Sequence, residues 1–395
     1  ECVRHGYEVV ALSMQAGTVD EASGIQQVIY QPFRSSTQGV HPWARDFETK
    51  LIRAEACFHQ CLQLLQEGYV PDLVIAHPGW GESLFVKEVW PETRLAIYCE
   101  FYYHVQGADI GFDPEFHSPD PALGPAMAMK NVNNTLHQLV ADAAISPTHW
   151  QASTFPAAFR DKITVIHDGI DTQRIRPDQN VSLDLNRSLR LTKQDEVITF
   201  VNRNLEPYRG YHVFMRALPA LLKQRPEARV IVVGGDEVSY GAKPADGQSW
   251  KNRYIAEVRD QISDTDWARV HFVGNIDYNV FIALLQLSTV HVYLTYPFVL
   301  SWSLIEAMSA GCAIVGSKTP PLQEVITHDV NGRLVDFFDG EALVKEIVSL
   351  LVDPDSRQRL GEAARAHAVS HYDLRTVCLP RQMQWVESLL SGSAP

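Results

Sequence analysis

Two arginine side chains share one short turn in the second half of the chain. Arg203 and Arg209 follow the apolar run Val197–Asn202, which has the composition of a buried strand. A guanidinium group is permanently charged, and its planar set of N–H donors matches phosphate oxygens, so two of them on one loop suit a diphosphate. Two loop arginines that only face solvent would show the same spacing. The pair is therefore a candidate anion site that needs support from neighbouring motifs.

A second polar turn follows the apolar run Val290–Thr295. Ser301 or Ser303 can cap the helix that is predicted to begin there, and the free N–H groups of a helix N-terminus attract an anion. Glu306 lies one turn inside that helix, where its carboxylate can accept two hydroxyls of a ribose. The spacing from Ser303 to Glu306 also fits a capping box, in which the carboxylate only satisfies the helix backbone. The residue types favour neither interpretation over the other.

Glycines end a third apolar run, Arg229–Gly235. Gly234 allows a ligand to approach the backbone closely. The stretch lacks the GxGxxG fingerprint, which argues against a dinucleotide cofactor. The sequence shows no metal-ligand constellation, so we expect no metal and no other cofactor.

Two polar side chains end predicted strands in the first half of the chain. His77 precedes a Gly-rich turn, where its ring can form hydrogen bonds with a ligand, and Glu100 ends the next strand. Single histidines and carboxylates at strand ends are also common in purely structural roles. His77 and Glu100 are therefore candidates for substrate contact rather than assigned residues.

Short β-branched runs alternate with amphipathic stretches along nearly the whole chain. Such alternation predicts parallel sheets with helices on both faces, and two sets of it predict two doubly wound α/β domains. The predicted strands are Glu8–Met14, Asp72–His77, Arg94–Phe101, Ala143–Ser146, Ile163–His167, Val197–Asn202, Arg229–Gly235, Val270–Gly274, Val290–Thr295 and Ala313–Gly316. The longer predicted helices are Ala44–Gln66, Tyr211–Gln224, Trp250–Ser263 and Glu341–Leu351. Ligands bind such domains at the carboxyl ends of the strands, so the turns described above lie where a site is expected, in the cleft between the domains.

A chain of 395 residues is too long for one ordinary hydrophobic core. The polar segment Thr172–Ser188 is predicted to link a first domain, residues 1–172, to a second domain, residues 189–371. Residues 372–395 are predicted to add a helix that can pack back on the first domain. The first domain is expected to lack its opening strand and Gly-rich turn, because Glu1–His5 has the pattern of a helix end.

Charge and cysteine usage narrow the classes of function. The net charge is −13, and residues 1–172 carry 10 Lys+Arg against 21 Asp+Glu. Nucleic-acid binding needs clustered cations, so no nucleic-acid partner is expected. The sequence has no apolar run of the ~18 residues that a membrane-spanning helix needs. The six cysteines form no CxxC pair and a large core needs no disulfide, so a reducing cytoplasm is the expected compartment.

Taken in order, these stretches resemble a known family. The series is Arg203, Arg209-Gly210, Val233–Gly235, His271–Asn275, Ser303–Gly311, Pro321–Ile326 and Asn331-Gly332. It is similar to the retaining glycosyltransferases of the GT-B fold, family 4. The resemblance implies an α/β fold of two Rossmann-like domains that face each other across a cleft, with a nucleotide diphosphate sugar as co-substrate of the second domain.

The resemblance also implies roles for individual residues. Arg203 and Arg209 would bind the diphosphate and stabilise the leaving nucleotide, Glu306 would bind the ribose, and Asn275 would pass near the base. The family usually has a lysine where this chain has Arg209. The implied reaction moves a sugar to a hydroxyl of a glycan, lipid-linked or small-molecule acceptor with retention of configuration, and the leaving phosphate takes the acceptor proton.

One position departs from the family. The family commonly has two glutamates eight positions apart, and the first of them touches the donor sugar. Eight positions before Glu306 is Phe298, whose ring cannot accept hydroxyl hydrogen bonds as a carboxylate does. Backbone groups of Val299, Leu300 and Ser301 are candidates for that role. Two alternatives follow: a sugar nucleotide 2-epimerase on the same fold, and a non-catalytic nucleotide-sugar binding protein.

Overall fold

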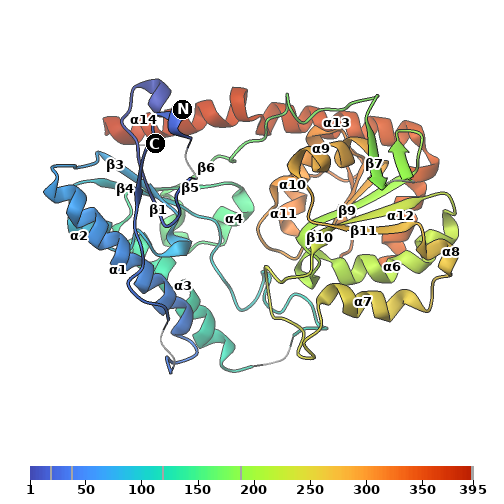
Figure 1. The fold of residues 1–395 in the computed structure, drawn as a ribbon, viewed down its shortest axis with the longest axis horizontal. Coiled ribbons are helices and arrows are strands. Elements are labelled where there is room, and N and C mark those ends of the chain that lie inside the picture. The colour runs from blue at the N-terminus through green and yellow to red at the C-terminus, as the bar shows by residue number, and fades with distance from the viewer. Residues whose placement is uncertain (18–19, 37–38, 118–119, 187–188, 393–395) are drawn as a thin grey trace. The chain divides into compact units, whose positions relative to one another are not determined.

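The computed structural model describes residues 1–17, 20–36, 39–117, 120–186 and 189–392. The chain divides into two compact units (Figure 1). Unit 1 consists of Glu1–His167 and Leu379–Pro395, and unit 2 consists of Asp168–Cys378.

Unit 1 contains two separate parallel sheets. The larger has the order β3-β4-β5-β6 and the smaller pairs β1 with β2. Their bounds are β1 Val10–Ser13, β2 Gln26–Ile29, β3 Leu73–Ala76, β4 Arg94–Tyr98, β5 Ala143–Ser146 and β6 Ile163–Val165. Strand β2 is absent from the strands that the sequence predicts, because its sequence QQVI is too polar and too short for a clear pattern.

The helices of unit 1 surround these sheets (Figure 1). They are α1 Arg45–Gln66, α2 Val86–Val89, α3 Leu123–Val140, α4 His149–Ser153, α5 Ala157–Arg160 and α14 Leu379–Ser391, with single 3-10 turns at Val3–His5, Glu21–Ser23 and Pro78–Trp80. Helix α14 belongs to this unit although it ends the chain. Its Trp385, Val386 and Leu389 are buried in one cluster with Ile145 and Ile166.

A groove of about 1030 Å³ separates the two sheets of unit 1. It is lined along its length by Glu8–Gln15 and Val70–His77, so β1 and β3 form its two walls. Apolar strand residues are partly exposed here, and Ile75 is 50% exposed.

Unit 2 contains one six-stranded parallel sheet with the order β11-β10-β9-β12-β13-β14. Its strands are β9 Val197–Asn204, β10 Arg229–Gly235, β11 Val270–Gly274, β12 Val290–Tyr293, β13 Ile314–Ser317 and β14 Arg333–Val335. The strand order reverses between β9 and β12. Such a reversal is the point at which open α/β sheets bind ligands, beyond the carboxyl ends of the strands.

Helices cover both faces of this sheet, with α6 and α7 on one side and α9 and α10 on the other (Figure 1). The helices are α6 Tyr211–Gln224, α7 Trp250–Arg259, α8 Asp264–Trp267, α9 Tyr278–Leu287, α10 Trp302–Ser309, α11 Pro320–Gln323, α12 Gly340–Val352 and α13 Pro354–Tyr372. A 3-10 turn, η4, spans Pro207–Arg209, and a π-helical turn, η5, spans Leu374–Cys378. The sheet interior is mostly apolar, with Thr199 and His291 among its few buried polar side chains, which explains why its strands are evident as β-branched runs in the sequence.

The segment predicted to be a linker is folded instead. Strand β7, Ser182–Asn186, pairs antiparallel with β8, Leu189–Thr192. Ile175, Val181 and Leu191 of this region are buried in the core of unit 2. The polar composition of Thr172–Ser188 concealed Ile175 and Val181, whose burial depends on contacts with residues far along the chain.

Candidate functional site

Unit 2 contains a pocket of about 480 Å³ at the carboxyl ends of its strands. The lining residues come from the carboxyl ends of β9 and β10, from the turns that follow β9, β10, β11 and β12, and from helices α9 and α10. They are Val201, Asn202, Arg203, Asn204, Glu206, Arg209, Val233, Tyr240, Asn275, Ile276, Tyr278, Phe281, Ser301, Ser303 and Glu306. Six of the residues singled out in the sequence therefore meet in one pocket, because the carboxyl ends of parallel strands lie at one edge of the sheet.

Arg209 is held in place by its surroundings. Its Nη1 donates to Thr295 Oγ1 at 2.7 Å and to the Val299 carbonyl at 3.0 Å. The guanidinium carbon lies 5.3 Å from the ring centre of Tyr240 and 5.9 Å from that of Phe298, within cation–π range. Arg209 is 7% exposed, so it presents its charge to the pocket from a packed wall, while Arg203 is exposed.

The turn that carries Arg209 requires a glycine after it. Gly210 has φ of +69°, and a Cβ at this position would lie 2.3 Å from Leu294 Cβ. No other residue type fits both the backbone conformation and the space. Gly210 thereby lets η4 approach the strand edge closely enough for Arg209 to reach Thr295.

Glu306 lies on α10 and is 7% exposed. Its Oε1 accepts a hydrogen bond from the Tyr278 hydroxyl at 2.5 Å. Burial raises the pKa of the Glu306 carboxyl above its ordinary value, and the Tyr278 hydroxyl opposes that rise. The N-cap of α10 is Ser301, whose Oγ accepts from the Ser303 N–H at 3.3 Å. The helix end is thus capped by Ser301, and Glu306 bonds Tyr278 rather than forming a capping box with Ser303.

The two glycines that end β10 allow close packing around the backbone. A Cβ on Gly234, whose φ is +154°, would lie 2.8 Å from Leu205 Cδ2. A Cβ on Gly235 would lie 2.6 Å from Asn204 Oδ1 and 3.2 Å from Asn275 Nδ2. Gly234 does not itself line the pocket, whereas Asn275 does.

Phe298, which stands where the family commonly has a glutamate, lies behind the pocket wall. Phe298 is 4% exposed, and its ring lies 5.6 Å from that of Tyr208 and 4.9 Å from that of Tyr240. Val299 and Leu300 are also buried and do not line the pocket. The Val299 carbonyl is already bonded to Arg209, so Ser301 is the residue of this stretch that reaches the pocket.

Glu206 is a pocket residue that the sequence reasoning missed. It is 1% exposed, and its Oε2 accepts from the backbone N–H groups of Ser239, at 2.8 Å, and Tyr240, at 3.1 Å. Burial raises the pKa of the Glu206 carboxyl, an effect opposed by these two hydrogen bonds and by Arg209 and Arg203. The available signal was a carboxylate placed between two arginines on one loop. Tyr240 and Tyr278, also missed, have no local pattern that marks them.

His77 and Glu100 come together in unit 1. His77 Nε2 lies 3.5 Å from Glu100 Oε2, and His77 Nδ1 accepts from the Gly79 N–H at 3.1 Å. The His77 ring is stacked on Tyr98 at 5.5 Å. The pair lies at the carboxyl ends of β3 and β4 of its own sheet, with both side chains partly exposed.

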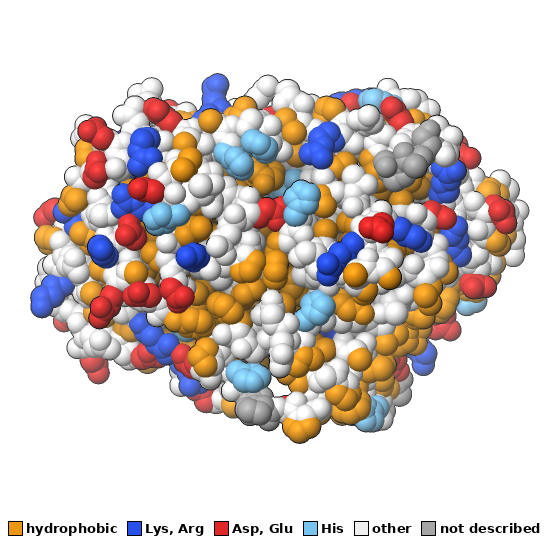
Figure 2. Space-filling view, turned by 180° about the vertical axis from the view of Figure 1, so that it is seen from behind, with side chains coloured by type: hydrophobic (Ala, Val, Ile, Leu, Met, Phe, Trp, Pro, Cys, Tyr) orange, Lys and Arg blue, Asp and Glu red, His pale blue; other side chains and the backbone are white. Residues whose placement is uncertain are grey.

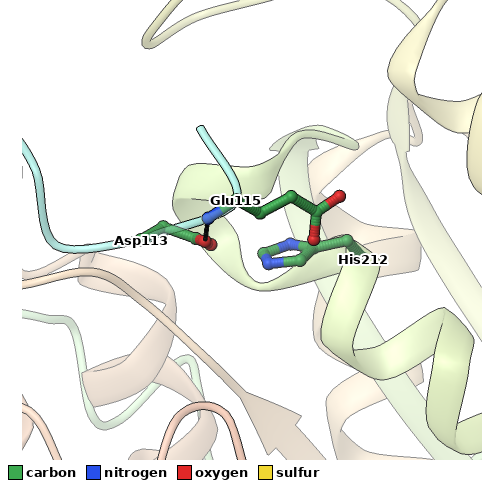
Figure 3. Close-up of side chains that lie close together, drawn as sticks. All are labelled: Asp113, Glu115 and His212. Carbon is green, nitrogen blue, oxygen red and sulfur yellow. Dashed lines mark hydrogen bonds between the residues drawn. The ribbon is translucent and has the colours of Figure 1, made fainter. Parts of the chain in front are cut away.

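The loop between β4 and α3 carries several acidic residues and contains a local turn at Asp113. Asp113 Oδ1 accepts from the Glu115 backbone N–H at 2.9 Å (Figure 3). The third side chain drawn in Figure 3, His212, belongs to α6 of unit 2. Because these residues belong to two different units, no metal site is assigned to them.

The surface carries charges of both signs. On the face drawn in Figure 2, Lys and Arg side chains are scattered among Asp and Glu side chains, with no single basic patch. Over the described ranges, the helices include none with the length and apolarity needed to cross a bilayer.

A doubly wound unit with a polar pocket at its strand reversal belongs to the class of open α/β folds that bind ligands at this point. Two family models match the chain: one described as Glycosyl transferase family 4 group covers residues 5–175, and one described as Glycosyl transferases group 1 covers residues 183–367. The chain therefore belongs to the group 1 glycosyltransferases, which confirms the family expected from the order of its motifs.

Individual relatives agree with this assignment. A D-inositol 3-phosphate glycosyltransferase of Streptomyces scabiei is 27% identical over 262 residues, which are 64% of this chain and 54% of that protein. A phosphatidyl-myo-inositol mannosyltransferase of Mycolicibacterium smegmatis is 27% identical over 207 residues, or 51% of this chain and 47% of that protein. The chain spans about half the length of the curated relatives it matches.

Solved structures share the fold. A sucrose-phosphate synthase from Thermosynechococcus elongatus has a TM-score of 0.72 and 17% identity, over 99% of this chain and 91% of that one. Anabaena HepE in complex with UDP and glucose has a TM-score of 0.65 and 18% identity, over 97% and 91% of the two chains. These likenesses confirm the expected GT-B fold class.

Proposed function

We propose that this protein transfers a sugar from a nucleotide diphosphate sugar to an acceptor hydroxyl, with retention of configuration. The observation that carries the proposal is the pocket in which Arg203, Arg209 and Glu306 meet at the strand reversal of unit 2. Its volume of about 480 Å³ is in the range of small-molecule sites. The structure of Anabaena HepE with UDP and glucose supports a donor of this kind.

Each end of the pocket suits one part of such a donor. Arg203 and Arg209 supply positive charge for a diphosphate, and the N-terminus of α10 adds N–H donors through Ser301 and Ser303. Glu306 supplies carboxylate oxygens for the ribose hydroxyls, and Asn275, which lines the same pocket, is the proposed neighbour of the base. A nucleotide would displace the Tyr278 hydroxyl from Glu306 or share the carboxylate with it.

The arginines also support the chemical step. Negative charge develops on the diphosphate as the bond to the sugar breaks, and a guanidinium fixed by Thr295 and Val299 stabilises that charge without reorganising. In our proposal the leaving phosphate takes the acceptor proton, so the protein supplies no general base. No metal ion or other cofactor enters the proposed reaction, because the arginines perform the neutralisation.

The acceptor belongs to unit 1 in this proposal. His77 and Glu100 are close enough to share a proton or an acceptor hydroxyl. The names of the relatives, which include inositol phosphate and phosphatidylinositol glycosyltransferases, support a polyol or a lipid-linked polyol among the candidate acceptors. Glycan and small-molecule acceptors are the other classes to test. We place the protein in the cytoplasm, since all six cysteines are free thiols and five are buried.

The proposal is tested by adding UDP-, GDP- and ADP-sugars to the protein and measuring its thermal midpoint. Mass action raises the midpoint only for a nucleotide that binds the folded state. The donor found in this way is then incubated with EDTA and an acceptor panel, and the anomeric configuration of the product is determined by NMR. Donor alone is incubated in parallel, because an epimerised donor without acceptor would identify an epimerase. Failure of every nucleotide sugar to shift the midpoint would contradict the proposal.

A further inference from the structure

Glu206 is a buried carboxylate in the pocket with only one of its oxygens anchored. The Oε2 atom accepts the two backbone N–H bonds from Ser239 and Tyr240. Within the described residues, Oε1 makes no hydrogen bond, although Glu206 is 1% exposed and lines the pocket. A carboxylate oxygen with this degree of burial needs a partner, because an unmet charged acceptor is costly. The pocket itself is where that partner must come from.

The anchoring leaves Glu206 little freedom to move away. Asn204 Nδ2 donates to Ser239 Oγ at 2.8 Å, which ties the loop after β10 to the loop after β9 a second time. Trp250 Nε1 donates to the Ala242 carbonyl at 3.0 Å and holds the far side of the same loop. Glu206 is therefore held in one position by the loop, and its Oε1 atom has a fixed place in the pocket.

Glu206 and Glu306 serve different regions of the pocket. Glu306 lies on α10 and bonds Tyr278 of α9, whereas Glu206 lies before η4 and bonds the loop after β10. Arg209 lies between these regions. Its guanidinium contacts the ring of Tyr240, whose N–H binds Glu206, and donates to the Val299 carbonyl just before α10. With the ribose on Glu306 and the diphosphate on the arginines, Glu206 is the remaining carboxylate of the pocket lining for the group beyond the diphosphate, and it lies close enough to both arginines to feel their charge.

The chemistry of Glu206 selects a neutral partner. An ionised carboxylate only accepts hydrogen bonds, and it repels phosphate oxygens, so its free oxygen suits a hydroxyl donor. Phe298 cannot provide this acceptor, because it has a buried ring with no polar atom. We propose that Oε1 of Glu206 accepts a hydroxyl of the donor's hexose and so helps to select which sugar is transferred. This assignment rests on the proposed function and names the sugar-binding group of the same pocket.

The experiment compares binding of a nucleoside diphosphate with binding of the corresponding diphosphate sugar. Affinities are measured by calorimetry for the wild type, Glu206→Gln and Ser239→Ala, using UDP and UDP-glucose or whichever pair the thermal screen selects. Glutamine keeps one oxygen for the N–H groups of Ser239 and Tyr240 and turns an NH₂ donor toward the pocket. Ser239→Ala removes the bond from Asn204 and keeps the carboxylate, so it is the control for loop anchoring.

We expect Glu206→Gln to lower the affinity for the diphosphate sugar about tenfold relative to the affinity for the diphosphate, the size of one charge-assisted hydrogen bond. The affinity for the diphosphate itself should not fall, because the substitution removes a negative charge near the phosphates. Ser239→Ala should keep the wild-type ratio of the two affinities. A donor that lacks the hydroxyl bound by Glu206 should bind the wild type about tenfold more weakly than the complete donor does. Glu206→Gln should bind the two donors with equal affinity.

Two results overturn the assignment. If Glu206→Gln weakens the diphosphate and the diphosphate sugar equally, Glu206 acts only by positioning the loop or balancing Arg209. If it weakens neither, the free oxygen contacts no ligand. A wild-type protein that binds neither compound would instead contradict the proposed function itself, so the two failures are distinguishable.

Discussion

The Tyr278 hydroxyl donates to Glu306 Oε1 at 2.5 Å, so the carboxylate proposed for the ribose is already hydrogen-bonded in the free protein. Tyr278 is 45% exposed and its ring lies under the guanidinium of Arg174 at 4.8 Å. The tyrosine thus stabilises a buried carboxylate until a ligand supplies hydroxyls of its own.

Replacement of Tyr278 by phenylalanine tests this relationship. Tyr278→Phe removes a donor from a buried carboxylate, and we expect the free energy of unfolding to fall by about 1–2 kcal/mol. The stabilisation gained from bound nucleotide should be larger than in the wild type, because the ribose hydroxyls then satisfy an unmet acceptor. Denaturant titrations with and without nucleotide measure both quantities. If Tyr278→Phe costs the same unfolding free energy in the wild type as in the Glu306→Gln background, the hydrogen bond contributes nothing.

The raised pKa of Glu306 predicts a pH dependence of stability. The folded-state pKa lies above the unfolded value, so ionisation of Glu306 costs stability as pH rises through that interval, and the cost persists at higher pH. Glu306→Gln removes this cost. We expect the variant to gain stability relative to the wild type between about pH 4 and pH 7, while losing nucleotide affinity.

Denaturant titrations at both ends of this range measure the difference. The control is Glu362→Gln, which replaces an exposed carboxylate on α13. A constant difference between wild type and Glu306→Gln across the range would show that the burial of Glu306 has no energetic consequence.

Substitutions of Arg203 and Arg209 are expected to differ in their effects on turnover and on stability. Arg203 is exposed, so Arg203→Ala should lower turnover about 10²-fold with the thermal midpoint unchanged. Arg209 is buried between two rings, so Arg209→Met should lower both turnover and stability. Arg209→Lys should keep more turnover than Arg209→Met, since the family usually has a lysine there. Lys223→Ala, an exposed cation on α6, controls for the loss of one charge. Turnover that is unaltered in both Arg203→Ala and Arg209→Met would contradict the phosphate assignment.

Gly210 is expected to be indispensable for the position of Arg209. Gly210→Ala forces a Cβ to within 2.3 Å of Leu294 Cβ, in addition to the strain of a positive φ. Gly247→Ala is the matched control, because Gly247 has φ of +76° and a Cβ there would have nothing within 4 Å. We expect Gly247→Ala to cost about 1 kcal/mol and Gly210→Ala to cost at least ~2 kcal/mol more, with nucleotide affinity lost only in the latter. Equal unfolding free energies of the two variants would contradict this account.

His77 is expected to affect transfer rather than donor binding. It belongs to unit 1, whereas the proposed donor pocket belongs to unit 2. His77→Gln retains an acceptor for the Gly79 N–H, so we expect the fold and nucleotide affinity to persist while transfer slows. His59→Gln, an exposed histidine on α1, is the control. An unchanged transfer rate in His77→Gln would show that His77 is not part of the acceptor site.

The sequence by itself determined the fold class, the family and the strand ends that carry Arg203, Arg209 and Glu306. These features have local signals. A buried parallel strand is a continuous β-branched run, and polar residues directly after it must lie at the carboxyl edge of the sheet. Strands β10 and β11 and helix α6 could therefore be located to the residue from periodicity alone.

Only the tertiary structure decided which groups surround those residues. The hairpin β7–β8 is folded onto unit 2 through a few apolar anchors in a polar segment, which no local pattern reveals. Glu206 became a pocket residue because two backbone N–H groups of a different loop bind one of its oxygens and leave the other free. Contacts of this kind join turns that follow different strands, and their partners are set by strand order and packing rather than by neighbours in the chain.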